Sequence, residues 1–320
     1  MLGPGGIVHW DDVESGRAEL GHLAGTWRDL GRGAGSIGVG VRRIEVDPDR
    51  WSTPVHRQTA EEEIFYVLRG SGISLQDEEA YEVRAGDCLV HLAGGKAHTL
   101  RAGDQGLDVL AFGTRVRTEI GHLPRAGVAW VGRTWTEVGG GEYPWEREVA
   151  AGEPEVPEPS ERPPSIVNLD DAPSEHEGRG RYLGEGAGSR LTGLNWISLP
   201  GGAMGAPPHC HSAEEEIFVV LEGAGTLELT PAPQASRLYG ADSAPESHAV
   251  RAGTVVSRPP GTRIAHAFRA GAERLTYLAY GTREPNDMAY YPRSNKIFFR
   301  GLGLIARLES LEYDDGEPAA

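Results

Sequence analysis

The sequence predicts an all-β protein built from two β-barrels or β-sandwiches in tandem, each formed by about half of the chain. The first indication is an internal repeat, in which blocks of residues recur in the same order in the two halves. The second is the form of the apolar segments, which are short, rich in β-branched or aromatic residues and bounded by glycine. The third is the abundance of Gly (45) and Pro (22) among 320 residues, which suits many turns between short strands.

The repeat is clearest at an acidic cluster. The sequence AEEEIF at 60–65 recurs at 213–218, which is 153 residues later. Further blocks match at offsets of 167 or 168, because the second copy has an insertion of loop-like composition between Gly223 and Val250. These pairs are 83–86 with 250–253, 98–103 with 266–271 and 111–115 with 279–283, and there is a fainter match of 7–12 with 166–171.

The repeat sets the expected domain boundaries. They are 1–115 for the first domain, 116–165 for an inter-domain segment, 166–285 for the second domain and 286–320 for a C-terminal extension that packs on the barrels and ends in an acidic tail. Residues 152–164 are rich in Pro and Glu and are expected to form an extended linker. Three tryptophans, Trp130, Trp135 and Trp145, make the preceding residues too apolar for a pure linker. We expect those residues to pack on the first barrel or to bridge the two.

The net charge of the chain bears on which classes of macromolecule it could bind. Lys and Arg total 31 and Asp and Glu total 47, which gives a net charge of −16. A chain this acidic repels phosphate backbones and anionic lipids, so we expect neither nucleic acid nor a membrane as a partner. There are only two cysteines, one in each half, and the N-terminus lacks the features of a signal peptide. The expected location is a reducing cytoplasm, without disulfides.

The second copy contains residues suited to a single metal ion. His209 and His211 are two positions apart, so on a strand both side chains point to one face and Cys210 points to the other. Glu216 precedes the next apolar strand, and His266 brings a third imidazole from far along the chain. Three neutral imidazoles and one carboxylate suit Fe(II) or Mn(II), which we favour, or Ni(II) or Zn(II), and they leave coordination positions open.

This stretch resembles the first motif of the cupin superfamily: His-x-His, three or four residues, Glu, six residues and Gly. The matching residues are His209, His211, Glu216 and Gly223. The second cupin motif, Gly, five residues, Pro-x-Gly and then a metal-binding His, is similar at Gly253, Pro259, Gly261 and His266. His266 comes two residues later than in the short form of this motif. The resemblance implies two double-stranded β-helix barrels of jelly-roll type, each with a pocket that could hold a metal.

The first copy keeps only part of the metal set. The corresponding residues are His56, Gln58, Glu63 and His98. Gln58 stands where the second copy has His211, and an amide oxygen is a weaker ligand than imidazole for late transition metals. Either this barrel binds metal weakly or it has become structural, and we favour the structural interpretation. His91 is expected not to be a ligand.

Six further side chains are candidates for the pocket of the second barrel. Alternation places Phe218 on the face of Glu216 and Phe268 on that of His266. The other candidates, which alternation does not place, are Trp196, Arg258, Arg263 and Tyr280. Glu214 and Glu215 are expected to lie on a solvated acidic face. Histidines without ligand spacing, expected at the surface or in the core, are His9, His22, His122, His176 and His248.

The cupin resemblance implies a wide range of chemistries, because the fold does not choose among them. Our first hypothesis is a metal-dependent enzyme that acts on a small organic molecule, with an oxygenase as the first choice and a decarboxylase or isomerase as further options. The competing hypothesis is a non-catalytic module that binds or senses a small ligand. Exposed sheet edges could pair two copies into a homodimer.

Overall fold

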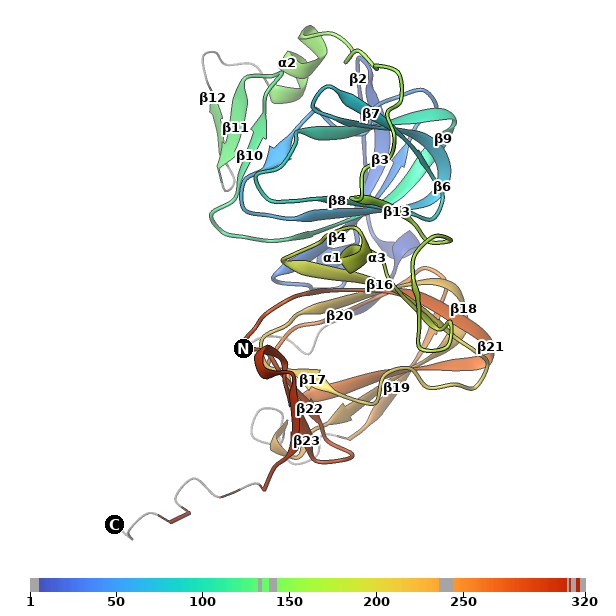
Figure 1. Ribbon diagram of the computed structural model, residues 1–320, viewed down its shortest axis with the longest axis vertical. Coiled ribbons are helices and arrows are strands. Elements are labelled where there is room, and N and C mark those ends of the chain that lie inside the picture. Colours follow the sequence, from blue (N-terminus) through green and yellow to red (C-terminus); the bar gives the residue numbers. More distant parts are fainter. Residues whose placement is uncertain are drawn as a thin grey trace.

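The computed structural model describes residues 6–131, 134–137, 143–235, 244–309, 311 and 315–316. Figure 1 shows two β-sheet bodies stacked along the longest axis, the first in blue to cyan and the second in yellow to orange. Strands dominate these residues, as the all-β prediction required. None of the helices in the described ranges is long and apolar enough to cross a membrane.

The first body is an eight-stranded sheet with the order β13-β8-β6-β9-β4-β3-β2, and β7 pairs with β6. Its strands are β2 (Ser15–Leu20), β3 (Leu23–Asp29), β4 (Val39–Val46), β6 (Glu63–Gln76), β7 (Glu79–Arg84), β8 (Asp87–His91), β9 (His98–Thr114) and β13 (Ile166–Asn168).

The second body repeats this topology with the order β1-β20-β18-β21-β16-β15-β14, and β19 pairs with β18. Its strands are β1 (Ile7–His9), β14 (Ser174–Glu175), β15 (Gly180–Tyr182), β16 (Thr192–Leu199), β18 (Glu216–Pro231), β19 (Glu246–Arg251), β20 (Thr254–Arg258) and β21 (Ile264–Thr282).

The first strand of each repeat lies in the sheet of the other repeat. In β1, Ile7 pairs with Val256 of β20, and in β13, Ile166 pairs with Leu89 of β8. This exchange explains the faint sequence match between 7–12 and 166–171, because the two segments occupy equivalent positions on opposite bodies. The chain is therefore tied across the junction twice.

Each repeat also has a small four-stranded sheet. One edge strand of this sheet, β5 or β17, lies in the first histidine motif. The strands are β5 (Arg57–Gln58), β10 (Ile120–Leu123), β11 (Val128–Val131) and β12 (Thr134–Glu137) in the first repeat, and β17 (Cys210–His211), β22 (Met288–Tyr291), β23 (Lys296–Phe299) and β24 (Leu304–Arg307) in the second. The structural repeat thus continues beyond the matched sequence blocks into the two segments predicted to lie outside the barrels.

The short helices connect or cover the sheets. They are α1 (Leu30–Gly33), α2 (Pro144–Ala150), α3 (Leu183–Gly186) and the 3₁₀ turns Trp10–Asp12, Pro233–Ala235 and Arg300–Leu302. Helix α2 packs on the first body, where Trp145 meets Trp27 with ring centroids 5.8 Å apart. The indole of Trp51 donates a hydrogen bond to Glu153, which fixes the following linker to the same body. Of the two placements considered for this segment, the structure shows packing on the first barrel.

Strand alternation divides the apolar side chains of the two large sheets between the inside of each body and a shared core at the junction. Phe65 and Phe218 point into the first and second bodies, respectively. Their neighbours Ile64 and Ile217 point instead to a shared core at the junction. Phe112 and Tyr280 meet in this core with ring centroids 5.0 Å apart. The period of two residues along a strand therefore builds both barrels and the surface that joins them.

The acidic cluster is not solvated, so the prediction for Glu214 and Glu215 is wrong. Each is only 3% exposed. Glu215 reaches into the first repeat and accepts hydrogen bonds from the backbone N–H groups of Ile37 (2.8 Å) and Val39 (3.2 Å). Glu214 accepts one from the N–H of Glu284 (2.9 Å) and pairs with Arg300. Backbone donors in tight loops need acceptors, and several such bonds offset the cost of burying a carboxylate.

Glu62 makes the reciprocal contact from the first repeat to the second. It is fully buried, and it accepts hydrogen bonds from the N–H of Arg190 (2.8 Å) and from the hydroxyls of Ser189 and Thr192 (2.6 Å each). Glu62 and Glu215 are the middle residues of the two EEE triplets, so the junction is held by a pair of equivalent carboxylates.

We predict that Glu62→Ala and Glu215→Ala each lower the free energy of unfolding by about 3 kcal/mol, because several buried donors lose their acceptor at once. Urea unfolding followed by tryptophan fluorescence measures the change. Glu82→Ala, at an exposed strand position, serves as the control. A loss no greater than that of the control would show that these carboxylates do not hold the junction.

Candidate metal centres and cavities

The second repeat brings its four predicted metal ligands together. Their side chains converge from β17, from β18 and from the start of β21, where the backbone of His209 bridges that of His266. The Oε2 atom of Glu216 lies 3.0 Å from Nε2 of His266, 3.3 Å from Nε2 of His211 and 4.0 Å from Nε2 of His209. All three imidazoles therefore present the same ring nitrogen to one carboxylate oxygen.

Hydrogen bonds on the far side of two rings fix this orientation. Nδ1 of His209 lies 2.8 Å from the carbonyl oxygen of Pro207, and Nδ1 of His211 lies 2.7 Å from Oδ2 of Asp287. Asp287 is itself held by the backbone N–H groups of Ala213 (2.9 Å) and Glu214 (3.1 Å). Partners of this kind orient histidine ligands in metal sites and raise their basicity.

Sequence reasoning missed Asp287. The residue lies outside every block that matches between the repeats, so no spacing pointed to it.

The donor set fits a divalent metal ion. Oε2 of Glu216 and Nε2 of His211 and His266 are buried, and none of them has a hydrogen-bond partner of good geometry. Buried polar atoms without partners are costly, and a cation bound by all of them would remove the cost. Three of the residues, His209, His211 and Glu216, form a compact group with one donor atom each.

The electrostatics of the four side chains also suit a cation. Burial alone would raise the pKa of Glu216, but the neighbouring His211 and His266 hold that pKa well below its ordinary value. Burial works in the opposite direction on His211, but Glu216 and Asp287 raise its pKa to about 10. Burial lowers the pKa of His266 to about 3. Metal binding needs an ionised carboxylate and neutral imidazoles, so a metal ion would compete with protonation of His211.

The cluster opens into a cavity of about 470 Å³ inside the second body. Phe218 and Phe268 line it, as predicted. The residues that line it without having been predicted include His176, Arg179, Tyr182, Asn195, Met204 and Tyr277. Nε2 of His176 lies 2.7 Å from the hydroxyl of Tyr182, so the two form a polar pair on an otherwise largely apolar wall. No spacing in the sequence distinguishes these residues.

Four of the predicted pocket residues do not line this cavity, which corrects the sequence analysis. Trp196 and Tyr280 pack at the junction core, because each lies one position out of phase with the inward-facing residues of its strand. Arg258 is buried beside the cluster and donates a hydrogen bond to the carbonyl of Ile264. Arg263 has a positive φ of 58° in a turn and donates to the carbonyl of Gln234.

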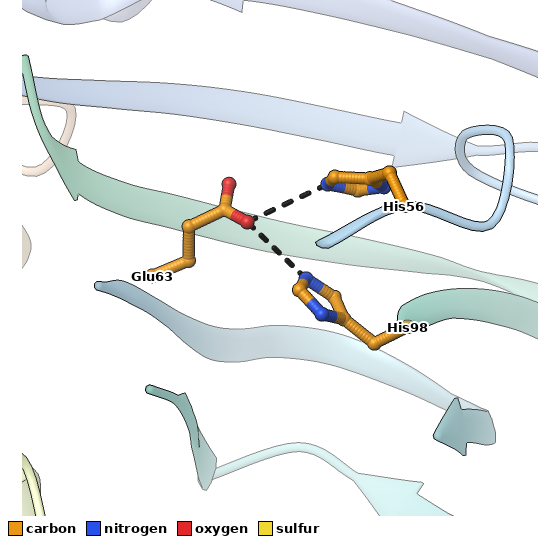
Figure 2. Close-up of side chains that lie close together, drawn as sticks. All are labelled: His56, Glu63 and His98. Carbon is orange, nitrogen blue, oxygen red and sulfur yellow. Dashed lines mark ion pairs between the residues drawn. The ribbon is translucent and has the colours of Figure 1, made fainter. Parts of the chain in front are cut away.

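The first repeat assembles a three-residue version of the cluster (Figure 2). Oε2 of Glu63 lies 3.5 Å from Nε2 of His56 and 3.2 Å from Nε2 of His98. Gln58 lines the cavity next to this cluster, near Gly121. His91 stacks on His98 with ring centroids 3.6 Å apart, so it lies inside the barrel as a wall of the cluster. Oε2 of Glu63 and Nε2 of His98 have no good hydrogen-bond partner, so the donors for a weak metal site are present.

Comparisons with known proteins agree with this architecture. Residues 42–112, from β4 to near the end of β9, match the family model described as Cupin domain. No curated protein matches the chain in sequence.

Several solved structures share the fold over most of its length. The oxalate decarboxylase of Lactobacillus farciminis, as a formate complex, is 16% identical over 88% of this chain and 87% of that chain, with a TM-score of 0.59. The oxalate decarboxylase of Bacillus subtilis at pH 4.6 is 16% identical over 86% and 75%, with a TM-score of 0.58. A second structure of the Bacillus subtilis enzyme, from work on its Mn(II) centres, is 16% identical over 88% of this chain and 78% of that chain, with a TM-score of 0.59.

At this identity the likeness concerns the fold and not the reaction. The family match identifies a cupin domain at residues 42–112, and the solved structures show that the fold of these decarboxylases extends over most of the chain.

Proposed function

We propose that the second barrel holds one divalent metal ion on His209, His211, Glu216 and His266, and that the protein is a metal-dependent enzyme acting on a small organic molecule. The observation that carries the proposal is the convergence of four donor side chains on one point, with buried donor atoms that lack other partners. Fe(II) or Mn(II) is the preferred ion, because a mixed imidazole and carboxylate set suits both.

The cavity beside the cluster supports a catalytic role. Its volume of about 470 Å³ falls within the range of roughly 300–1,000 Å³ for small-molecule sites. When bound, the metal would supply Lewis acidity and open positions for substrate, water or dioxygen. The chain itself contributes an apolar wall that limits water, through Phe218, Phe268 and Leu199. The hydrogen-bonded pair of His176 and Tyr182 can hold a proton near the substrate.

We place an oxygen-dependent reaction first. The wall nearest to Glu216 and His266 is formed by aromatic and aliphatic side chains, and it suits an apolar substrate and dioxygen. Decarboxylation of a small acid is the second candidate, because Arg179 lines the cavity and could bind a carboxylate. The shared fold with oxalate decarboxylases adds to this second candidate by analogy only.

A turnover assay with two readouts tests the catalytic proposal. Protein loaded with Fe(II) or Mn(II) is incubated with panels of small phenols, diketones and carboxylic acids, and both oxygen uptake and CO₂ release are recorded. We expect one readout to respond, and we expect a chelator to abolish it because the open coordination positions are then lost. Full activity of a metal-free preparation, or no turnover of any panel member despite tight ligand binding, would support the non-catalytic binding module instead.

We predict about one tightly bound transition-metal ion per chain in the wild-type protein and almost none in His211→Ala, because the remaining donors no longer enclose the ion. Elemental analysis after removal of loosely bound metal measures the content. His56→Ala is the matched variant in the first repeat and should leave the content unchanged. A content near two ions per chain, with one surviving in His211→Ala, would mean that the first barrel also binds metal.

We predict that Asp287→Asn weakens metal binding by about 10- to 100-fold, because the carboxylate that orients His211 and raises its basicity is lost. Glu119→Gln is the control, since Glu119 is the corresponding carboxylate of the first repeat and accepts hydrogen bonds from Thr59, Ala60 and Glu61. Competition with a metallochromic indicator gives both affinities. Equal losses in the two variants would indicate a general effect on folding.

A further inference from the structure

The first barrel contains a cavity of about 370 Å³, and the described residues that line it come from the first repeat and the segment after it. Its walls are unusually rich in aromatic side chains. Trp27 and Phe65 come from the barrel, while Trp130, Trp135 and Trp145 come from β11, β12 and α2. Trp27 and Trp145 meet edge to face at 5.8 Å, and Trp130 and Trp135 meet at 5.1 Å. Indole rings offer flat apolar surfaces for a planar molecule.

A cation without a partner lines the same cavity. Arg42 lies on β4, two positions from the inward-facing Ile44, and both residues line the cavity. Among the described residues, the guanidinium of Arg42 forms no ion pair or hydrogen bond, whereas the neighbouring Arg115 pairs with Asp29 (3.4 Å) and donates to the carbonyl of Ser36 (2.7 Å).

Charges of both signs line the cavity, since Arg32, Arg42 and Arg115 share it with Asp29, Glu61, Glu63 and Glu119. The four carboxylates already have donors: Asp29 pairs with Arg32 and Arg115, Glu63 lies against two histidines, and Glu61 and Glu119 accept from backbone N–H groups. Arg42 is therefore the lining charge that is left for an anion among the described residues.

The cavity of the second barrel differs from that of the first barrel at the position of Arg42. The repeat offset places Asn195 where the first barrel has Arg42, and Asn195 also lines its own cavity. The amide of Asn195 carries no charge, and the arginine that lines the second cavity, Arg179, already donates to the carbonyl of His176 and to Glu177. The two barrels thus share a fold but present different chemistry to a ligand.

We propose that the first barrel is a separate, non-catalytic binding site for a planar, largely apolar molecule that bears one anionic group. The anion binds Arg42, and the planar part lies among the tryptophans. The described part of the segment 116–150 belongs to this site, since Trp130, Trp135 and Trp145 line the cavity. The proposal does not depend on the metal-dependent activity of the second barrel.

Isothermal titration of the full chain tests the site with benzoate and indole-3-acetate, and with the neutral amides of both as matched probes. We expect both carboxylates to bind, and to bind about tenfold or more tightly than their amides. Arg42→Gln should remove this preference, with no change in the melting temperature, since the side chain has no partner to lose. Arg84→Gln, at an exposed position, should leave binding unchanged. Trp130→Ala removes a half-exposed indole that lines the cavity, and it should weaken the binding of both the carboxylates and their amides.

The same titrations on Asn195→Ala and His211→Ala locate the site. Unchanged carboxylate binding in both variants is expected, because neither residue lines the first cavity. Loss of binding in these variants, with Arg42→Gln unaffected, would place the probes in the second barrel and overturn the proposal. Carboxylates that bind no better than their amides, or no binding of either carboxylate at millimolar concentration, would overturn it as well.

Discussion

The arrangement of both barrels depends on two buried carboxylates that cross the junction in opposite directions. Glu62 closes the loop at 189–192 of the second repeat, and Glu215 closes the loop at 37–39 of the first. Each charge is taken out of water, which is costly, and each is stabilised only because several N–H and O–H donors of the other repeat point at it. Neither barrel can leave the other without exposing both the donors and the shared apolar core.

The same constraint explains why three consecutive glutamates have three separate tasks. Along a strand and its entry, successive side chains point in different directions. The first glutamate of each triplet accepts from the chain that leads into the small sheet, at Val116 or Glu284. The second crosses the junction, and the third, Glu63 or Glu216, points into the barrel among histidines. A motif that looks uniform in sequence therefore serves the junction between the repeats, the contact with the chain that leads into the small sheet, and the histidine cluster inside the barrel.

Much of the fold could be predicted from sequence, because the repeat and the strand pattern are local properties. The convergence of His209, His211, Glu216 and His266 was also predictable, since alternation and the cupin motifs specify it. The burial of Glu215 was not, because its partners lie about half a chain away and are backbone groups that any residue provides. Nor was the failure of Trp196 and Tyr280 to reach the cavity, because a shift of one residue in register reverses the face of a side chain.

In each repeat, one carboxylate holds the turn that follows the first histidine motif. Comparison of the two carboxylates shows how the repeats could come to differ in their metal ligands without loss of stability. In the second repeat, Asp287 accepts from three backbone N–H groups and also from His211. In the first, Glu119 accepts from the equivalent three groups, at 2.7 Å each, although Gln58 has replaced the histidine. The turn is thus held whether or not a metal ligand is present. The first barrel can therefore differ at the position of His211 without losing this turn, and its cavity can present Arg42 where the second cavity presents Asn195.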